Sequence, residues 1–128
     1  MEKVFIEATC KQIVDSAYRV HKELGPGLLE SVYQYCLVEE LRNRNIRVIQ
    51  EVFLPLFYFG KSLNKDFRID ILVENTIIIE VKSVEFLIPV HSAQIISYLK
   101  LAKRPLGFLI NFNVSLIKEG IKRYANNY

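Results

Sequence analysis

The chain has 128 residues, of which 51% are hydrophobic and 24% charged, and its 17 Lys and Arg against 14 Asp and Glu give a formal net charge of +3. We expect a single folded domain over residues 1–128, because disordered, collagen-like and low-complexity chains have a different composition. No apolar run approaches the roughly 20 residues that a membrane span needs, so the sequence predicts no membrane partner.

The amino terminus and the cysteines bear on the expected location. The first residues lack the apolar stretch of a secretory signal, so the cytoplasm is the expected location. Cys10 and Cys36 are too few for a disulfide framework or a zinc quartet. We expect both to be small buried hydrophobic residues of a reducing compartment.

Two amphipathic helices open the chain. Over residues 4–24, apolar side chains recur at spacings of three and four, which is typical of one buried helix face. Gly25 is placed to end this helix. The same spacing predicts a second helix over residues 28–44.

The rest of the chain alternates between strands and helices. Residues 51–59 are rich in β-branched and aromatic residues, and residues 60–64 are typical of a turn. The expected later elements are two strands, a helix, a short strand and a short closing helix, at residues 67–73, 76–83, 91–101, 106–111 and 115–124. The order α-α-β-β-β-α-β-α predicts an α/β fold, with a four-stranded mixed sheet and a helical crossover, flanked by helices on both faces.

Asp70 and Glu80 interrupt the apolar runs of two neighbouring strands, where acidic residues are rare. A three-residue loop at positions 74–76 matches the apolar residues of the two strands. It sets three of them against three others on one face: Ile69, Ile71 and Val73 against Val81, Ile79 and Ile77. The same register sets Asp70 opposite Glu80 on the other face, which Lys82 shares.

Two carboxylates held about 5 Å apart repel one another unless a cation lies between them. A divalent metal ion with oxygen ligands meets this demand, and Mg²⁺ needs few protein ligands. Lys82 would then hold or deprotonate an attacking water, or stabilise charge on a phosphate. The alternative is a salt-bridged cluster at a solvated strand end, in which Lys82 neutralises one acid.

Asp70, followed by Glu80-Val81-Lys82 on the next strand, resembles the PD-(D/E)xK nuclease signature, although Ile69 stands where that motif has its proline. The segment Gly27-Leu28-Leu29-Glu30-Ser31-Val32-Tyr33 is similar to the element that names the GxxExxY family, a small single-domain branch of that superfamily. Further similar segments follow in order, so that the resemblance covers nearly the whole chain: residues 66–70, 79–83, 91–94, 97–100 and 109–112.

The resemblance implies a restriction-endonuclease-like core and a Mg²⁺-dependent nuclease, with Mn²⁺ as a substitute, that cuts DNA phosphodiester bonds through a metal-activated water. It implies metal ligation by Asp70, Glu80, the Val81 carbonyl and Glu30, and it makes Lys82 the catalytic lysine. The alternative function is a catalytically inactive relative that binds nucleic acid or a protein partner. A further alternative is a small interaction protein whose acids are surface charge.

Gln94 and Tyr98 stand at positions i and i+4 of one helix. They are similar to a Gln-x-x-x-Tyr element that orders the site or the DNA, so Gln94 joins the catalytic set. Tyr98, His91 and Tyr33 are candidates for substrate contact. For the tyrosines the alternative is a core ring with a hydrogen-bonded hydroxyl, and for His91 it is a residue of the helix start.

Nucleic acid, expected to be DNA, is the predicted partner. Basic residues near the helix ends would contact phosphates rather than bases. A homodimer is compatible with so small a domain, because it would place two sites on two strands.

Overall fold

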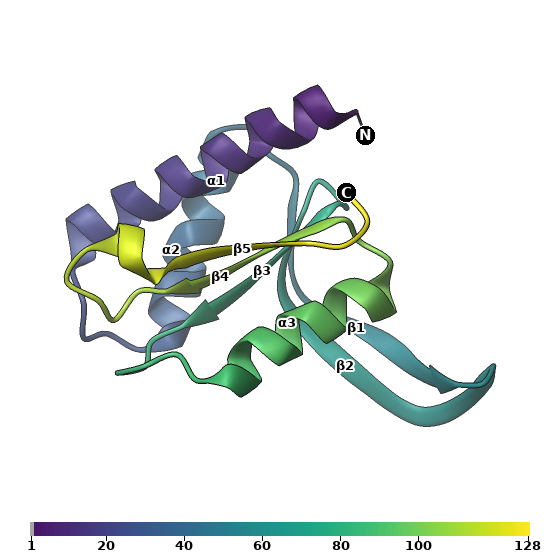
Figure 1. Cartoon of the computed structure of the whole chain (residues 1–128). Helices are drawn as coiled ribbons and strands as arrows, with labels where there is room; N and C mark the ends of the chain where they lie inside the picture. The colour runs from purple at the N-terminus through teal and green to yellow at the C-terminus, as the bar shows by residue number, and fades with distance from the viewer. Residues whose placement is uncertain (1) are drawn as a thin grey trace.

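The computed structural model describes residues 2–128. Within that range, three helices and a five-stranded mixed sheet form three layers (Figure 1). The helices are α1 (Lys3–Leu24), α2 (Glu30–Asn43) and α3 (Pro89–Ala102). The strands, in chain order and in sheet order, are β1 (Val48–Tyr58), β2 (Lys61–Val73), β3 (Ile77–Lys82), β4 (Leu106–Asn111) and β5 (Ile121–Ala125).

The sheet is mixed because one connection crosses over it. Strands β3 and β4 are parallel, with α3 between them in the chain, whereas the other neighbouring strands are antiparallel. The predicted α/β fold with a mixed sheet and a helical crossover is confirmed. Among residues 2–128, no helix has the length and hydropathy that crossing a bilayer requires.

Helices cover both faces of the sheet, as the sequence predicts. On one face, α1 and α2 bury apolar side chains such as Ile13 and Leu37 against Ile79 and Phe108. On the other face, α3 packs Leu99 against Leu72 and Ile78 of the sheet and against the β1–β2 hairpin. This second face carries the hairpin and α3, between which the candidate site lies.

The closing helix predicted at residues 115–124 is wrong, and the sheet has five strands rather than four. A 3₁₀ turn (Ile117–Gly120) leads into β5, which pairs with β4. Ile121 packs with the α1–α2 cluster and Tyr124 with the α3 cluster, so the two side chains face opposite sides of the sheet. Their spacing of three suits one helix face or two strand faces equally well. All six residues of β4 are buried, and such a strand needs a partner on both edges.

The β1–β2 hairpin bends where Glu51 lies opposite Asp70. The paired residues of the two strands run from Val48 to Gln50 and resume at Val52, and Glu51 between them has a φ of 55°. Below the bend, Ile71 packs with the α1–α2 cluster, whereas above it Ile69 packs with the α3 cluster. The predicted position of Ile69 opposite Val81 is therefore wrong, because the strand exchanges its faces at Asp70.

The turn of this hairpin is shorter than the predicted turn over residues 60–64. Phe59 and Gly60 form it, and the following residues already belong to β2. The hairpin consequently extends well beyond the rest of the sheet (Figure 1).

We expect Gly120→Ala to destabilise the protein by about 1–3 kcal/mol or more. A methyl group on Gly120 would collide with the backbone carbonyl of Asn111 and approach Val114. Because the obstacle is backbone, the turn before β5 must shift. Urea denaturation measures the effect, with Lys122→Ala, an exposed change on β5, as the control. Equal stability of the two variants would contradict the close approach.

Candidate functional site

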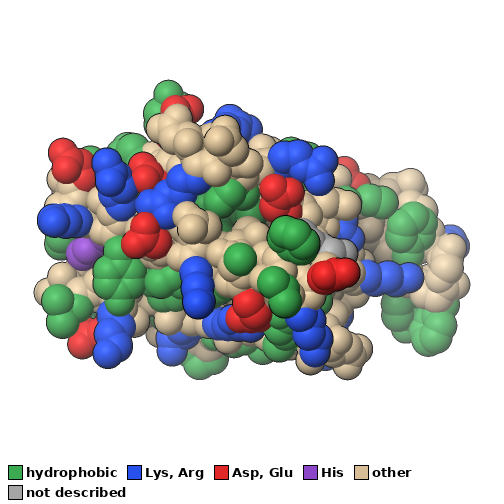
Figure 2. Space-filling view, turned by 90° about the horizontal axis from the view of Figure 1, so that it is seen from above, with side chains coloured by type: hydrophobic (Ala, Val, Ile, Leu, Met, Phe, Trp, Pro, Cys, Tyr) green, Lys and Arg blue, Asp and Glu red, His purple; other side chains and the backbone are tan. Residues whose placement is uncertain are grey.

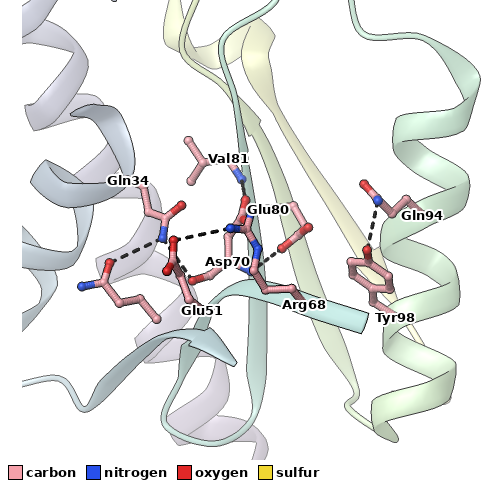
Figure 3. A network of polar contacts seen from close by, with 9 residues as sticks. Gln34, Glu51, Arg68, Asp70, Glu80, Val81, Gln94 and Tyr98 are labelled. Carbon is pink, nitrogen blue, oxygen red and sulfur yellow. Dashed lines mark hydrogen bonds and ion pairs between the residues drawn. The ribbon is translucent and has the colours of Figure 1, made fainter. Parts of the chain in front are cut away.

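The two acids lie where β2 and β3 separate. The predicted register is confirmed up to the acids, since Val73, Leu72 and Ile71 pair with Ile77, Ile78 and Ile79. Beyond these pairs the carboxylates replace the backbone ladder. The Asp70 N–H donates to Glu80 Oε2 at 2.8 Å, and the Val81 N–H donates to Asp70 Oδ2 at 2.9 Å (Figure 3). Each acid is thus fixed by the backbone of the opposite strand.

Burial gives this pair an unusual charge state. Asp70 and Glu80 are each only 4% exposed. Loss of solvation and the neighbouring Asp70 carboxylate raise the pKa of Glu80 to about 8, against the opposing influence of its hydrogen bond from the Asp70 N–H and of Lys82 and Arg68. In the metal-free protein the pair of carboxyl groups therefore retains a proton near neutral pH. A bound cation can replace that proton.

Arg68 and Glu51, which the sequence did not single out as site residues, extend the polar network along the hairpin. The Arg68 guanidinium contacts Asp70 Oδ1 at 3.1 Å and Glu51 Oε1 at 3.4 Å (Figure 3). Arg68 lies two residues before Asp70, the spacing at which the side chains of a strand share a face, so its guanidinium is placed to reach that acid. The half-exposed guanidinium partly neutralises Asp70 and can be displaced.

Gln34 was also missed. It projects from α2, where its amide donates to the Asp70 carbonyl and to the Gln50 side chain, both at 3.4 Å. These long contacts connect α2 to the strand that carries the acids. The signal in the sequence was available, since Gln34 is one helical turn after Glu30.

Lys82 ends β3 on the face that Glu80 occupies, and its charge lowers the pKa of that carboxyl. The backbone around it is fixed from β4. The Phe112 N–H donates to the Lys82 carbonyl at 2.9 Å, and the Asn111 side chain bonds both the N–H and the carbonyl of Val84. Lys82 is therefore held on a well-supported strand end.

Gln94 and Tyr98 face the acids from α3 (Figure 3). The Gln94 amide donates to the Tyr98 hydroxyl at 3.0 Å. Burial, together with the negative charge of Glu80, raises the pKa of Tyr98. The Tyr98 ring also lies 5.0 Å from the ring of Phe67 on the hairpin. The Tyr98 ring is thus packed and its hydroxyl is hydrogen-bonded, as in the structural alternative, and its contact with substrate stays a prediction.

Glu30 is the exposed first residue of α2, and the structure does not group it with the two buried acids. Among residues 2–128, no cluster of three or more His, Cys, Asp or Glu side chains is close enough to hold a metal ion. The start of α2 is nevertheless tied to the end of β3, because the Ser83 hydroxyl donates to the Leu28 carbonyl at 2.6 Å.

Tyr33 is a core residue with a hydrogen-bonded hydroxyl, which was the alternative to its predicted contact with substrate. Its fully buried ring stacks on Phe112, with centroids 4.7 Å apart. Its hydroxyl donates to the Gly25 carbonyl at 2.5 Å and accepts from the Leu28 N–H at 3.1 Å. Enclosed in this way, Tyr33 cannot touch a substrate, and it holds the turn that precedes α2.

His91 lies at the start of α3, the alternative role that its position in the sequence indicated. Its Nδ1 accepts from the Ile88 N–H at 3.1 Å at the beginning of α3. His21 is buried on α1, with its Nε2 2.7 Å from the Val114 carbonyl oxygen.

The donor set fits a hard divalent cation that keeps much of its own water. Two adjacent carboxylates supply oxygen ligands and need positive charge, and Mg²⁺ is commonly bound through only one or two carboxylates. Asp70 and Glu80 meet this requirement without a third acid.

The comparisons with known proteins agree with this geometry. A family model described as the PD-(D/E)XK nuclease superfamily matches residues 7–124. No curated protein and no solved structure matches the chain significantly.

The raised pKa of Glu80 predicts that the metal-free protein loses stability as pH rises. This carboxyl titrates near 4.5 ordinarily and near 8 in the folded protein, so between these values the folded state retains a proton that the unfolded state has released. We expect the free energy of unfolding to fall by up to about 1.4 kcal/mol per pH unit in this window. Urea denaturation in EDTA measures this dependence.

Glu80→Gln keeps the shape of the side chain and removes its charge, so it should abolish most of this slope. Glu74→Gln, a change in the turn after β2, should leave the slope intact. An unchanged slope in the Glu80 variant would assign the pH dependence to other groups.

Proposed function

Because the chain belongs to the PD-(D/E)XK nuclease superfamily, we propose that it hydrolyses phosphodiester bonds of DNA with Mg²⁺, for which Mn²⁺ can substitute. The observation that carries the proposal is the buried Asp70–Glu80 pair, with Lys82 on the same strand face. A fold alone needs no such pair, since burying two neighbouring carboxylates opposes folding.

Asp70 and Glu80 would hold the metal ion, with the Val81 carbonyl as a further ligand and Glu30 acting on the ion's water shell from α2. When bound, the ion supplies a Lewis acid and lowers the pKa of a coordinated water. The protein's part is to fix the carboxylates, and their hydrogen bonds to the backbone of the opposite strand do so.

Lys82 would take up or hold the proton of the attacking water and oppose the charge that develops on phosphorus oxygens. Gln94 would orient a polar group of the site through its bond to the Tyr98 hydroxyl. Arg68 would turn from Asp70 to a substrate phosphate once the metal ion neutralises that carboxylate. Its half-exposed guanidinium, planar and permanently charged, is suited to phosphate.

We also propose membership of the GxxExxY branch. The hydrogen bonds of Tyr33 to Gly25 and Leu28 give a physical reason for part of that element. The tyrosine fixes the turn, the turn sets where α2 begins, and Glu30 is its first residue. The cytoplasm and a homodimer stay predictions of the sequence.

Cleavage assays test the proposal. We expect Lys82→Ala and Asp70→Asn each to reduce the rate of DNA cutting with Mg²⁺ by about 100-fold or more. Labelled single-stranded, duplex and branched DNA, with an RNA of matching sequence, measure both the activity and its substrate. Asp66→Asn, an exposed acid of the same strand, is the matched control and should cut normally.

Cutting that survives either site variant, or that persists in EDTA, would contradict the assignment. No cutting of any substrate by the unaltered protein would favour the inactive binding relative.

Metal binding is predicted separately from activity. Mg²⁺ or Mn²⁺ should raise the unfolding temperature, because a ligand of the folded state at 100 times its Kd adds about 2.7 kcal/mol of stability. Asp70→Asn should remove this effect. Glu30→Gln should weaken binding by about tenfold if Glu30 acts on the ion's water shell. Thermal denaturation measures the unfolding temperatures, and isothermal calorimetry measures the metal affinities of the unaltered protein and of each variant. Equal Mn²⁺ affinity in the Glu30 variant would remove that residue from the site.

A further inference from the structure

The β1–β2 hairpin extends well beyond the rest of the sheet (Figure 1), and hydrophobic side chains are exposed on it (Figure 2). Phe53, Phe57 and Phe59 are 63%, 57% and 92% exposed, and Tyr58 is exposed beside them. The opposite face of the hairpin packs against the core, where residues such as Leu54 and Phe67 contact the α3 cluster. The exposed aromatics therefore cost solubility without filling the interior.

The tip of the hairpin has a residue that is unfavourable for its turn. Phe59 and Gly60 both have positive φ, 47° and 76°, as the two central residues of a type I′ turn do. Folding favours Asn, Asp or Gly at the first of these positions, and a bulky residue with positive φ is an outlier. A phenylalanine that is strained and nearly fully exposed points to a function of its ring.

The aromatic face is continuous with the candidate site. Phe53 lies directly opposite Arg68 in the β1–β2 ladder, and Arg68 contacts Asp70. From Asp70 the strand continues to Lys61 beside the tip, a reach of roughly 30 Å at the rise of an extended chain. On the same face of β2, Asp66 and Ser62 lie opposite Pro55 and Phe57, whereas Lys61 and Lys65 alternate with them and belong to the other face. The aromatic face thus begins beside Arg68 at the acids and runs outward to the tip.

We propose that this face of the hairpin binds a single-stranded segment of nucleic acid, whose bases stack on Phe53, Phe57 and Phe59. The proposal rests on the nuclease function proposed above and names the form of the substrate that the site receives. Proteins hold unpaired strands on aromatic platforms with basic groups beside them, because every base offers a stacking face and every nucleotide a phosphate. Here Arg68, which lies opposite Phe53, is the basic group. A second copy of the chain or a lipid surface would use the phenylalanines but has no need of an arginine that links them to two carboxylates.

A single tryptophan at the tip gives a direct readout, since the chain contains none. Phe59→Trp keeps an aromatic ring there, and Phe5→Trp places the matched reporter at another exposed position, on α1. In EDTA, which prevents metal-dependent cutting, a single-stranded oligodeoxynucleotide should quench the tryptophan at position 59 and not the one at position 5. An abasic oligonucleotide of equal length and a blunt duplex should quench it much less.

Phe59→Asn separates binding from folding. It installs the Asn-Gly pair that a type I′ turn prefers, so the unfolding temperature should stay the same or rise. Binding of the single-stranded oligonucleotide should nevertheless weaken by about tenfold, the loss of one stacking contact. A merely structural role for Phe59 would not produce these opposite responses.

Quenching of the position-59 reporter that follows protein concentration without nucleic acid, or that follows anionic lipid vesicles instead, would overturn the proposal. Equal affinity of Phe59→Asn and the unaltered protein would do the same. If the unaltered protein cuts DNA and the hairpin reporter is silent, the hairpin inference alone fails. If the reporter responds and no substrate is cut, the catalytic function alone fails.

Discussion

Two acids that share one buried position are the constraint on which the rest of this structure depends. Asp70 and Glu80 are almost without solvent, and their repulsion is visible in the raised pKa of Glu80. The surrounding groups all compensate for that repulsion. Two backbone N–H groups donate to the pair, Arg68 contacts one acid, and the charge of Lys82 acts on the other. A proton is the remaining compensation in the metal-free protein, and a divalent ion is the stronger one.

The separation of β2 from β3 follows from the same constraint. The backbone pairing of β2 and β3 ends at Ile71 and Ile79. Beyond it, the N–H groups of Asp70 and Val81 donate to carboxylates instead of to backbone carbonyls of the opposite strand. Because they do, the strands part and β2 exchanges its faces, which places Ile69 with the α3 cluster. The site and the direction of the hairpin are therefore consequences of one local event in β2.

The sequence predicts most of this fold because hydrophobic matching is sensitive to register. A slip of one residue would have exposed Ile71 and Ile79, so the apolar residues alone place Asp70 near Glu80. What failed depended on information that is not local. The strand at residues 121–125 is selected by the fully buried β4 beside it, and its apolar spacing also suits a helix. Ile69 joins the α3 cluster only because β2 exchanges its faces at Asp70, which the period of two for an uninterrupted strand cannot predict. The position of Glu51 depends on the β1–β2 register, which links residues far apart in the chain.

Three departures from the rules of folding lie along the β1–β2 hairpin and the strand beside it. Acids stand inside a buried strand pair, Glu51 adopts a positive φ within β1, and Phe59 adopts one at the hairpin tip. Each lowers stability, by about 1–2 kcal/mol for a non-glycine residue in the left-handed region. Strain confined to turns would need no explanation beyond chain reversal, but Glu51 is opposite Asp70 and Phe59 is at the end of the same hairpin. These unfavourable features run from the carboxylates to the tip of the hairpin, which is the reason for proposing that the hairpin acts together with the site.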